Sequence, residues 1–453
     1  MGNRTYLQIV AVPPSVDLPI YDEVDVLVAG GGPAGVAAAE TAAAHGQNTL
    51  LVEAYGFLGG QAVAGYSGTI CGMYYGSDHA AEEDPKQCVF GWTEKFCREM
   101  QKNNGLTKPQ LYGKTFLVPH DPQIWKEVAE GMLLQSGARI LYHTKVVGVI
   151  KEGAVFKGLV IDTKSGLAQI RAKAIIDATG DADVAYRSGL PFTMGNNGAI
   201  QNPTMIFRLG GVNVPEFLKY WGEDTISPEK VSEKISSLKK EYGDLPRAKI
   251  WVYYTTRPNE LFMNVTAIYG RDGRALNVCD PDDHTEAEIV ARKQVRDYAR
   301  FFVDNIPGCE NSFVNDLSAE VGIRQTRSIV GIDRLKNDDV ASGRKRTDGI
   351  AKCPWPIELH NGEKPYMYWL INDYYEIPYG ALVPIEGENI IAAGRNLSAE
   401  HQALASARVT AQCFQYGHAA GLAADLMLRK NIRFRDIHGE EIRHLLNEEG
   451  ARL

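Results

Sequence analysis

The chain has 453 residues, which is enough to bury a large core and too long for one ordinary domain, so we expect two lobes. Hydrophobic residues make up 44% and charged residues 23%, and this balance argues against a disordered or fibrous chain. The net charge of −8 argues against nucleic acid as a partner, and no apolar run approaches the roughly 18 residues needed to cross a bilayer.

The seven cysteines are scattered through the chain and show no CxxC spacing. An odd, scattered set predicts reduced thiols in a cytoplasmic protein and argues against a disulfide framework or a zinc site. We therefore predict no metal. The first twenty residues lack the order of a signal peptide, because prolines interrupt them, and we interpret 1–20 as an extended arm.

The first regular elements predict a βαβ unit. Val24–Ala29 is a short apolar, β-rich run, and glycines follow it directly. An alanine-rich helix is expected from Pro33 to about His45, where Gly46 ends it, and Thr49–Glu53 is the next strand. A strand, a glycine turn, a helix and a second strand in this order are typical of nucleotide-binding α/β folds.

The rest of the chain predicts a less regular middle and a return to core elements near the end. Expected helices are Trp92–Gln101, Pro122–Gln135 and Thr285–Val303, and expected strands are Lys145–Ile150, Val155–Ile161, Gln169–Ala172, Ala174–Thr179, Thr204–Leu209, Leu261–Ile268 and Asn389–Ala393. A long apolar helical stretch follows the last strand and ends near Met427.

Nucleotide-type segments at both ends of the chain predict an α/β protein with a discontinuous Rossmann-type domain and an inserted α+β substrate domain. The expected parts are the arm at 1–20, the first part of the nucleotide domain at 21–185, the substrate domain at 186–384, the second part at 385–430 and a C-terminal helical tail at 431–453.

The glycine turn GGGPAG matches the dinucleotide-binding fingerprint. Gly30 permits the tight turn, Gly32 lets the backbone approach a pyrophosphate, and Gly35 allows close packing of helix on strand. Glu53, at the end of the next strand, is placed to accept hydrogen bonds from ribose hydroxyls. The alternative is a glycine-rich turn in an ordinary α/β protein, but the strand, the helix and the acid all favour a nucleotide.

Two further turns favour FAD over NAD. Ala178–Asp181 and Ala393–Asn396 each follow a predicted core strand, and an extended FAD needs contacts along its whole length. No second GxGxxG follows a strand, so we predict no separate NAD(P)H domain.

Several segments between about residues 21 and 427 carry a family resemblance. They are VDVLVAGGGPAGVAAA, LVEAYGFLGGQA, AIIDATGDADVA, EVGIRQTRSIVG, IIAAGRNLSAEHQALASARV and YGHAAGLAA. With them the chain resembles the FAD-dependent oxidoreductases related to the fumarate reductase and succinate dehydrogenase flavoproteins. The match lacks the His-Gly-Ala-x-Arg segment of the fumarate reductases, since six residues separate His401 from Arg408, and this argues against dicarboxylate reduction.

The resemblance implies FAD contacts along the chain, and the helix that begins around Ser406–Val409 would point its N-terminus at the flavin. The implied contacts are Gly30, Gly32, Pro33, Ala34 and Gly35 at the pyrophosphate, Glu53 and Ala54 at the ribose, Gly59, Gly60 and Gln61 at the phosphates and ribityl chain, Val146 or Val147 at the adenine, Ala178, Thr179, Gly180 and Asp181 in the adenosine and phosphate half, and Gly394, Arg395 and Asn396 near the ribityl chain and pyrophosphate.

Three side chains are candidates for catalysis. His401 could exchange a proton with the substrate, or it could simply pack or cap a helix. Arg324 and Arg327 would share a helix face, where they either clamp a carboxylate or, as we favour, pair with Glu320 and Asp333. Arg408 is costly to bury alone, so we expect a carboxylate or the cofactor beside it.

These features predict an FAD-dependent dehydrogenase or reductase that transfers a hydride between a small organic substrate and the flavin. A flavin-dependent monooxygenase and a non-catalytic flavin-binding partner subunit are the alternatives. The sequence identifies no electron acceptor and does not decide whether the protein forms a homo-oligomer. We expect neither a nucleic acid nor a membrane as partner.

Overall fold

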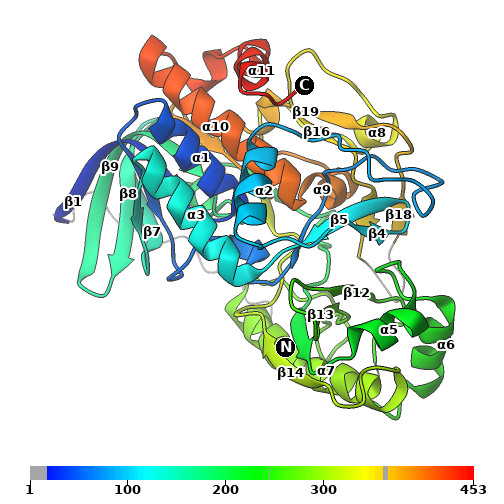
Figure 1. Cartoon of the computed structure of the whole chain (residues 1–453). Coiled ribbons are helices and arrows are strands. Elements are labelled where there is room, and N and C mark those ends of the chain that lie inside the picture. The colour runs from blue at the N-terminus through cyan, green and yellow to red at the C-terminus, as the bar shows by residue number, and fades with distance from the viewer. Residues whose placement is uncertain (1–17, 244, 361–365) are drawn as a thin grey trace.

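The computed structural model describes residues 18–243, 245–360 and 366–453. Most of the predicted arm at 1–20 lies outside these residues. Figure 1 shows a large domain built on a twisted sheet and covered by long helices, with a smaller lobe below it. Among the described helices, none is both long and apolar enough to span a membrane.

The predicted βαβ unit is confirmed. Strand β1 (Ile20–Ala29) leads through the glycine turn into helix α1 (Pro33–Ala44), and strand β2 (Thr49–Val52) returns beside β1. The two strands are parallel, with Val28 opposite Leu51. Their facing segments are fully buried, as expected for parallel strands covered on both faces.

The main sheet has seven strands. Six follow the order β6-β2-β1-β9-β8-β7, and the seventh, β20, pairs with the end of β9 that β8 leaves unpaired. β20 is parallel to β9, so residues near the end of the chain complete a sheet begun near residue 20. This confirms a discontinuous Rossmann-type α/β domain. The remaining bounds are β6 Arg139–Leu141, β7 Lys145–Glu152, β8 Val155–Thr163, β9 Gly166–Asp177 and β20 Ile390–Ala392.

One prediction about this sheet is wrong. Gln169–Ala172 and Ala174–Thr179 were expected as two strands, but β9 runs through both without interruption. Lys173, which lies between the two predicted segments, projects outward and pairs with Asp25 at 2.7 Å. Because β9 pairs with β1 along almost its whole length, one outward-facing lysine does not interrupt it.

Helix α10 (Thr410–Lys430) packs directly on α1. A side chain at Gly417 would place its Cβ 2.0 Å from the Ala34 carbonyl oxygen, so glycine is needed for this approach. The predicted single helical stretch is in fact two helices, since α9 covers His401–Ala407 and Val409 adopts an extended conformation before α10. The other helices of the domain are α2 Trp92–Lys102, α3 Pro122–Ser136, α4 Asp183–Arg187, α8 Asn337–Ala341 and α11 Gly439–Glu448.

The smaller lobe is an antiparallel sheet, in the order β12-β13-β11-β14, with three helices (Figure 1). Its separate core uses buried residues between Met205 and Val321, whereas those between Leu335 and Val383 pack in the same core as α1 and α10. The separately packed lobe is therefore narrower than the predicted substrate domain at 186–384. Its elements are β11 Phe207–Gly210, β12 Trp251–Tyr254, β13 Glu260–Asn264, β14 Phe313–Leu317, α5 Val214–Trp221, α6 Glu229–Leu238 and α7 Pro281–Asn305.

Further short strands pair in small antiparallel sheets. They are β3 Thr69–Ile70, β4 Gln110–Tyr112, β5 Thr115–Pro119, β10 Phe192–Met194, β15 Arg327–Ile329, β16 Gly349–Cys353, β17 Ile357–Leu359, β18 Tyr366–Tyr368 and β19 Tyr375–Pro378.

Candidate cofactor and substrate site

A cavity of about 720 Å³ begins at the glycine turn and continues toward the smaller lobe. Fifteen of the nineteen predicted cofactor residues line it, although they come from segments far apart in the chain. These are Gly30, Gly32, Pro33, Ala34, Glu53, Ala54, Gly60, Gln61, Val146, Ala178, Thr179, Gly180, Asp181, Gly394 and Arg395.

The other four predicted residues lie behind or beside the wall. A Cβ on Gly35 would stand 1.8 Å from the Gly30 carbonyl oxygen, so Gly35 serves helix–strand packing. Asn396 donates from Nδ2 to the Asp177 carbonyl oxygen at 2.9 Å, Gly59 precedes the short helix at Gly60–Ala62, and Val147 lines a neighbouring hollow.

The glycine turn leaves open space where a pyrophosphate would bind. Gly30 has φ +100°, and a Cβ there would lie 2.6 Å from the Ala178 carbonyl oxygen, so the turn requires glycine. At Gly32 the nearest atom to an added Cβ is the Gly60 Cα at 3.8 Å. The backbone N–H groups that open α1 are therefore accessible from the cavity, as an anion site at a helix N-terminus requires.

Glu53 stands at the end of β2 and faces this turn. Its carboxylate accepts hydrogen bonds from the backbone N–H groups of Gly31 at 2.7 Å and Tyr55 at 2.9 Å. Burial raises the pKa of Glu53, and these two N–H groups limit the rise. The carboxylate is thus fixed at the position where the fingerprint needs a ribose acceptor.

The two distant turns predicted to contact the cofactor are tied to each other. Arg395 donates to the Asp181 carboxylate at 2.8 Å, and Thr326 also donates to it. Although burial alone would raise the pKa of Asp181, Arg395 and Thr326 hold it below its usual value. This pair fixes the second part of the domain against the first.

The Ala178–Asp181 turn is organised by the buried Asp177 at the end of β9. Its carboxylate accepts from the Thr179 hydroxyl at 2.7 Å, the Thr179 backbone N–H at 3.2 Å and the Ala185 backbone N–H at 3.0 Å. One side chain therefore sets both the turn and the start of α4.

Replacing Asp177 with alanine is expected to lower the free energy of unfolding by about 3 kcal/mol, because three donors, two of them on the half-buried Thr179, lose their buried acceptor. Urea unfolding of the cofactor-free protein measures this loss. The exposed Asp162 on β8 gives a matched control, and Asp162→Ala should change stability by less than about 0.5 kcal/mol. Equal losses in the two variants would contradict the assigned role of Asp177.

Beyond the cradle, the same cavity reaches a cluster of ionisable side chains, which we call the arginine cluster: Arg247, Arg324, Arg408, Glu358 and His360. Arg324, Arg408, Glu358 and His360 line the cavity, and Arg247 lies behind His360. Arg247, Arg324, Glu358 and His360 are buried, and the partial exposure of Arg408 is consistent with its place on the wall.

A chain of hydrogen bonds holds the carboxylate of this cluster. The Tyr112 hydroxyl donates to Glu358 Oε1 at 2.5 Å, and His360 Nε2 lies 3.1 Å from the same oxygen. On its other side, His360 Nδ1 lies 2.6 Å from the Arg247 guanidinium, which can only donate. Nδ1 is therefore the acceptor and Nε2 carries the proton, so both ring nitrogens are occupied.

Burial, the neighbouring Arg324 charge and the Arg247 charge lower the pKa of His360 to about 3, so the imidazole is neutral near pH 7. Burial alone would raise the pKa of Glu358, but His360, Tyr112 and Arg408 hold it well below its usual range. Glu358 is therefore ionised, and it is the carboxylate that faces the three arginines.

A family model described as FAD dependent oxidoreductase matches residues 25–446. The chain belongs to this family. FAD is accordingly the cofactor, and the open cradle at Gly32, the anchored Glu53 and the linked turns at Asp181 and Arg395 fit it.

Comparison with solved structures shows which known proteins have a similar fold. A search of curated proteins finds no match. The structure of p-nitrophenol 4-monooxygenase PnpA from Pseudomonas putida is similar with 12% identity and a TM-score of 0.50, covering 95% of this chain and 87% of that one. A geranylgeranyl bacteriochlorophyll reductase-like protein from Thermoplasma acidophilum has 16% identity and a TM-score of 0.49, covering 95% and 85%. At 12% identity the likeness to the monooxygenase is one of fold alone.

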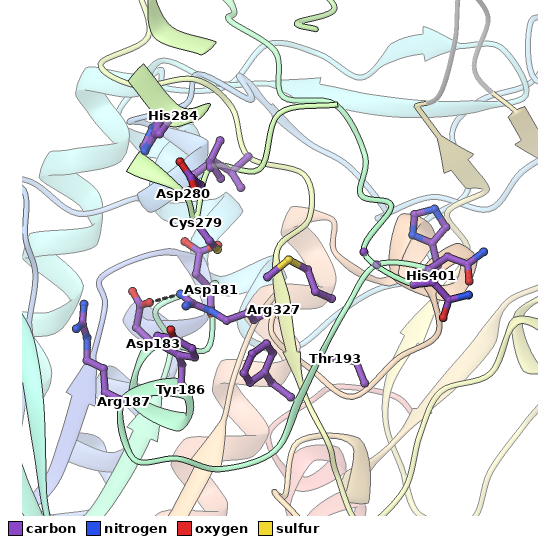
Figure 2. A pocket seen from close by; sticks show the side chains of 18 of the residues that line it. Asp181, Asp183, Tyr186, Arg187, Thr193, Cys279, Asp280, His284, Arg327 and His401 are labelled. Atoms are coloured by element: carbon purple, nitrogen blue, oxygen red, sulfur yellow. Dashed lines mark hydrogen bonds and ion pairs between the residues drawn. The ribbon is translucent and has the colours of Figure 1, made fainter. Parts of the chain in front are cut away.

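Of the three predicted catalytic residues, the oxidoreductase brings Arg324 and Arg408 to the cavity but not His401. His401 begins α9 and lines a neighbouring hollow of about 1770 Å³, which shares Asp181, Glu320 and Ile323 with the cavity. Figure 2 shows it apart from Asp181 and Arg327 in that hollow. Burial lowers the pKa of His401. This placement gives no support to a role for His401 beside the cofactor cradle.

The predicted helix face shared by Arg324 and Arg327 is wrong. Arg327 begins strand β15, and the segment before it is irregular, so side chains three residues apart do not align. The expected pairing with Glu320 and Asp333 is also absent: Arg327 pairs with Asp183, as Figure 2 shows, and stacks on the Tyr186 ring at 4.2 Å.

Sequence reasoning missed Glu358, His360, Arg247 and Tyr112. A signal existed for the first two, because IELH places an acid and a histidine two residues apart in an apolar strand, on one face. Arg247 lies in an irregular stretch before β12, and nothing in its local pattern distinguishes it from a surface arginine.

Proposed function

We propose that this oxidoreductase transfers a hydride between a small organic substrate and FAD. The observation that carries the proposal is the continuity of one cavity from the nucleotide cradle to the arginine cluster. Such a cavity can hold a dinucleotide along one part and a small molecule in the other. Aromatic side chains border the substrate part, which keeps water out and limits substrate size; they are Tyr112, Trp251, Tyr253 and Trp355.

When bound, FAD supplies a two-electron centre that can accept or give a hydride. The protein binds the cofactor through the open turn at Gly32 and the acceptor Glu53, and it orients the two halves of the cradle through Asp181 and Arg395.

The start of α10 supplies electrostatic support in the same cavity. Thr410 opens this helix of 21 residues and lines the cavity, and no side chain caps the helix N-terminus. The Ala411 N–H donates to the Cys71 carbonyl oxygen at 3.2 Å, and the positive end of the helix dipole stabilises negative charge beside it. The position agrees with the predicted helix start around Ser406–Val409.

The proposal includes a closer family relationship and a reaction type. The relationship to the fumarate reductase and succinate dehydrogenase flavoproteins rests on the sequence segments alone. The choice of a dehydrogenase or reductase over a monooxygenase rests on the charged side chains Arg324, Arg408 and Glu358 at the substrate end of the cavity.

Anaerobic screening of the FAD-loaded protein against a metabolite panel tests the proposal, with the visible flavin absorbance as readout. We expect at least one compound to bleach the flavin without oxygen. Consumption of NAD(P)H and oxygen with a hydroxylated product would instead establish a monooxygenase. A flavin that no compound bleaches, in a protein that binds another chain stably, would establish a non-catalytic subunit.

A further inference from the structure

The arginine cluster carries more positive than negative charge. Three guanidinium groups, of Arg247, Arg324 and Arg408, face one ionised carboxylate, Glu358, since His360 is neutral. In the described parts of the chain, Glu358 is held by Tyr112 and His360, and no carboxylate forms an ion pair with any of the three arginines. Two positive charges therefore lack a counter-charge in a buried place, where such an imbalance is costly.

The contacts of the two cavity-lining arginines are with neutral oxygens. Arg324 donates to the Asn202 carbonyl oxygen at 2.7 Å and lies 3.5 Å from Asn264 Oδ1. Arg408 donates to Gln201 Oε1 at 3.3 Å. Each guanidinium has five N–H groups, so both retain free donors toward the cavity.

Unpartnered polar atoms on the wall point to the same kind of ligand. Arg408 Nε and Trp355 Nε1 are buried N–H groups without an acceptor among the described residues. Among the buried side-chain atoms of the described residues that lack a partner, none that lines the cavity is an acceptor. A wall with surplus donors and surplus positive charge is complementary to an oxygen-rich anion.

We propose that the arginine cluster binds the oxyanion group of a small organic acid, either a carboxylate or a phosphate ester, with Arg324 and Arg408 as its direct partners. This names the substrate class of the proposed oxidoreductase, and so it rests on the proposed function.

One further residue, Arg247, positions this site from behind His360. Arg247 stacks on the Trp251 ring at 4.6 Å and holds His360 through Nδ1, which leaves its charge behind the pocket. Burial and the charges of Arg247 and Arg408 lower the pKa of Arg324 well below its usual value. An incoming anion would relieve this repulsion, so anion binding and arginine charge stabilise each other.

Titration of the FAD-loaded protein with acetate and, separately, with inorganic phosphate tests the proposal. We expect one or both anions to perturb the flavin absorbance saturably and to raise the melting temperature. Arg324→Met and Arg408→Met should each weaken anion binding about 10- to 100-fold, which is the effect of losing a charged hydrogen bond. FAD affinity should stay within about threefold in both variants, because the cradle is untouched. Arg292→Met, on an exposed face of α7, is the control and should change neither affinity.

The proposal fails if neither anion changes the flavin spectrum or the melting temperature, or if both variants bind anions as the unaltered protein does. It also fails if a neutral alcohol or sugar bleaches the flavin equally well in Arg324→Met, a result that would leave the proposed hydride transfer intact. Acetate binding without phosphate binding assigns a carboxylate, and the reverse assigns a phosphate ester. Anion binding by a protein whose flavin no organic acid bleaches would support the site and contradict the proposed function.

Discussion

Replacing Gly32 with alanine is expected to give a folded protein that no longer binds FAD. Gly32 has an ordinary φ of −68°, and the nearest atom to an added Cβ is 3.8 Å away, so the protein itself accommodates a methyl group. The methyl group would occupy the space through which the backbone approaches the pyrophosphate. We expect the Kd for FAD to rise on the order of 100-fold, which corresponds to about 2.7 kcal/mol.

Equilibrium titration of the cofactor-free protein by flavin fluorescence measures this Kd, and the melting temperature of the cofactor-free variant checks the fold. Gly131→Ala is the matched control, because nothing lies within 4 Å of an added Cβ on that residue of α3. Gly35→Ala is unsuitable, since its Cβ would collide with the Gly30 carbonyl oxygen. Binding of FAD by Gly32→Ala within threefold of the unaltered protein would refute the assignment.

Removing the carboxylate of the arginine cluster is expected to be strongly destabilising. In Glu358→Ala the buried charges of Arg247 and Arg324 and the partly exposed charge of Arg408 face one another without Glu358 between them. Removing one partner from a group of buried opposite charges lowers the free energy of unfolding by about 3 to 5 kcal/mol. The Tyr112 hydroxyl also loses its acceptor. Chemical unfolding of the cofactor-free protein measures the loss.

The pH dependence of this loss follows from the lowered pKa of Glu358. A carboxyl whose pKa is lower in the folded than in the unfolded state stabilises the fold above its unfolded pKa, about 4.3, and loses that contribution as the pH falls. The difference in stability between the unaltered protein and Glu358→Gln should thus be full at pH 7 and shrink below about pH 4. The exposed Glu127 on α3 supplies a control through Glu127→Ala. A difference that stays constant from pH 7 to pH 3 would show that Glu358 acts without its charge.

The nucleotide half of the site was predictable because its signals are local. A buried strand, a glycine turn and the start of a helix are consecutive in the chain, and the acid Glu53 closes the next strand. Sheet topology then brings the turns after β9 and β20 to the same edge, because carboxyl ends of parallel strands gather there. Fifteen predicted residues consequently line one cavity.

The substrate half was not predictable in the same way. Arg247 belongs to the smaller lobe, and Arg408 to the break between two helices. Glu358 lies in the short strand β17 of the main domain, and His360 directly follows that strand. These residues come together only because the smaller lobe packs against the main domain, and no local sequence pattern predicts that packing. His401 was a candidate because it precedes a helix expected to face the flavin, and packing or capping a helix was the alternative. The break at Val409 gives α9 and α10 separate starts, and only α10 lines the cavity.

A crystal structure of the FAD-loaded protein is the most direct test of where the redox centre lies. We predict the pyrophosphate at the Gly32 turn and the isoalloxazine ring in the same cavity, between the start of α10 at Thr410 and the arginine cluster. An isoalloxazine ring in the neighbouring hollow beside Cys279 and His401 would contradict both the proposed function and the assigned substrate site.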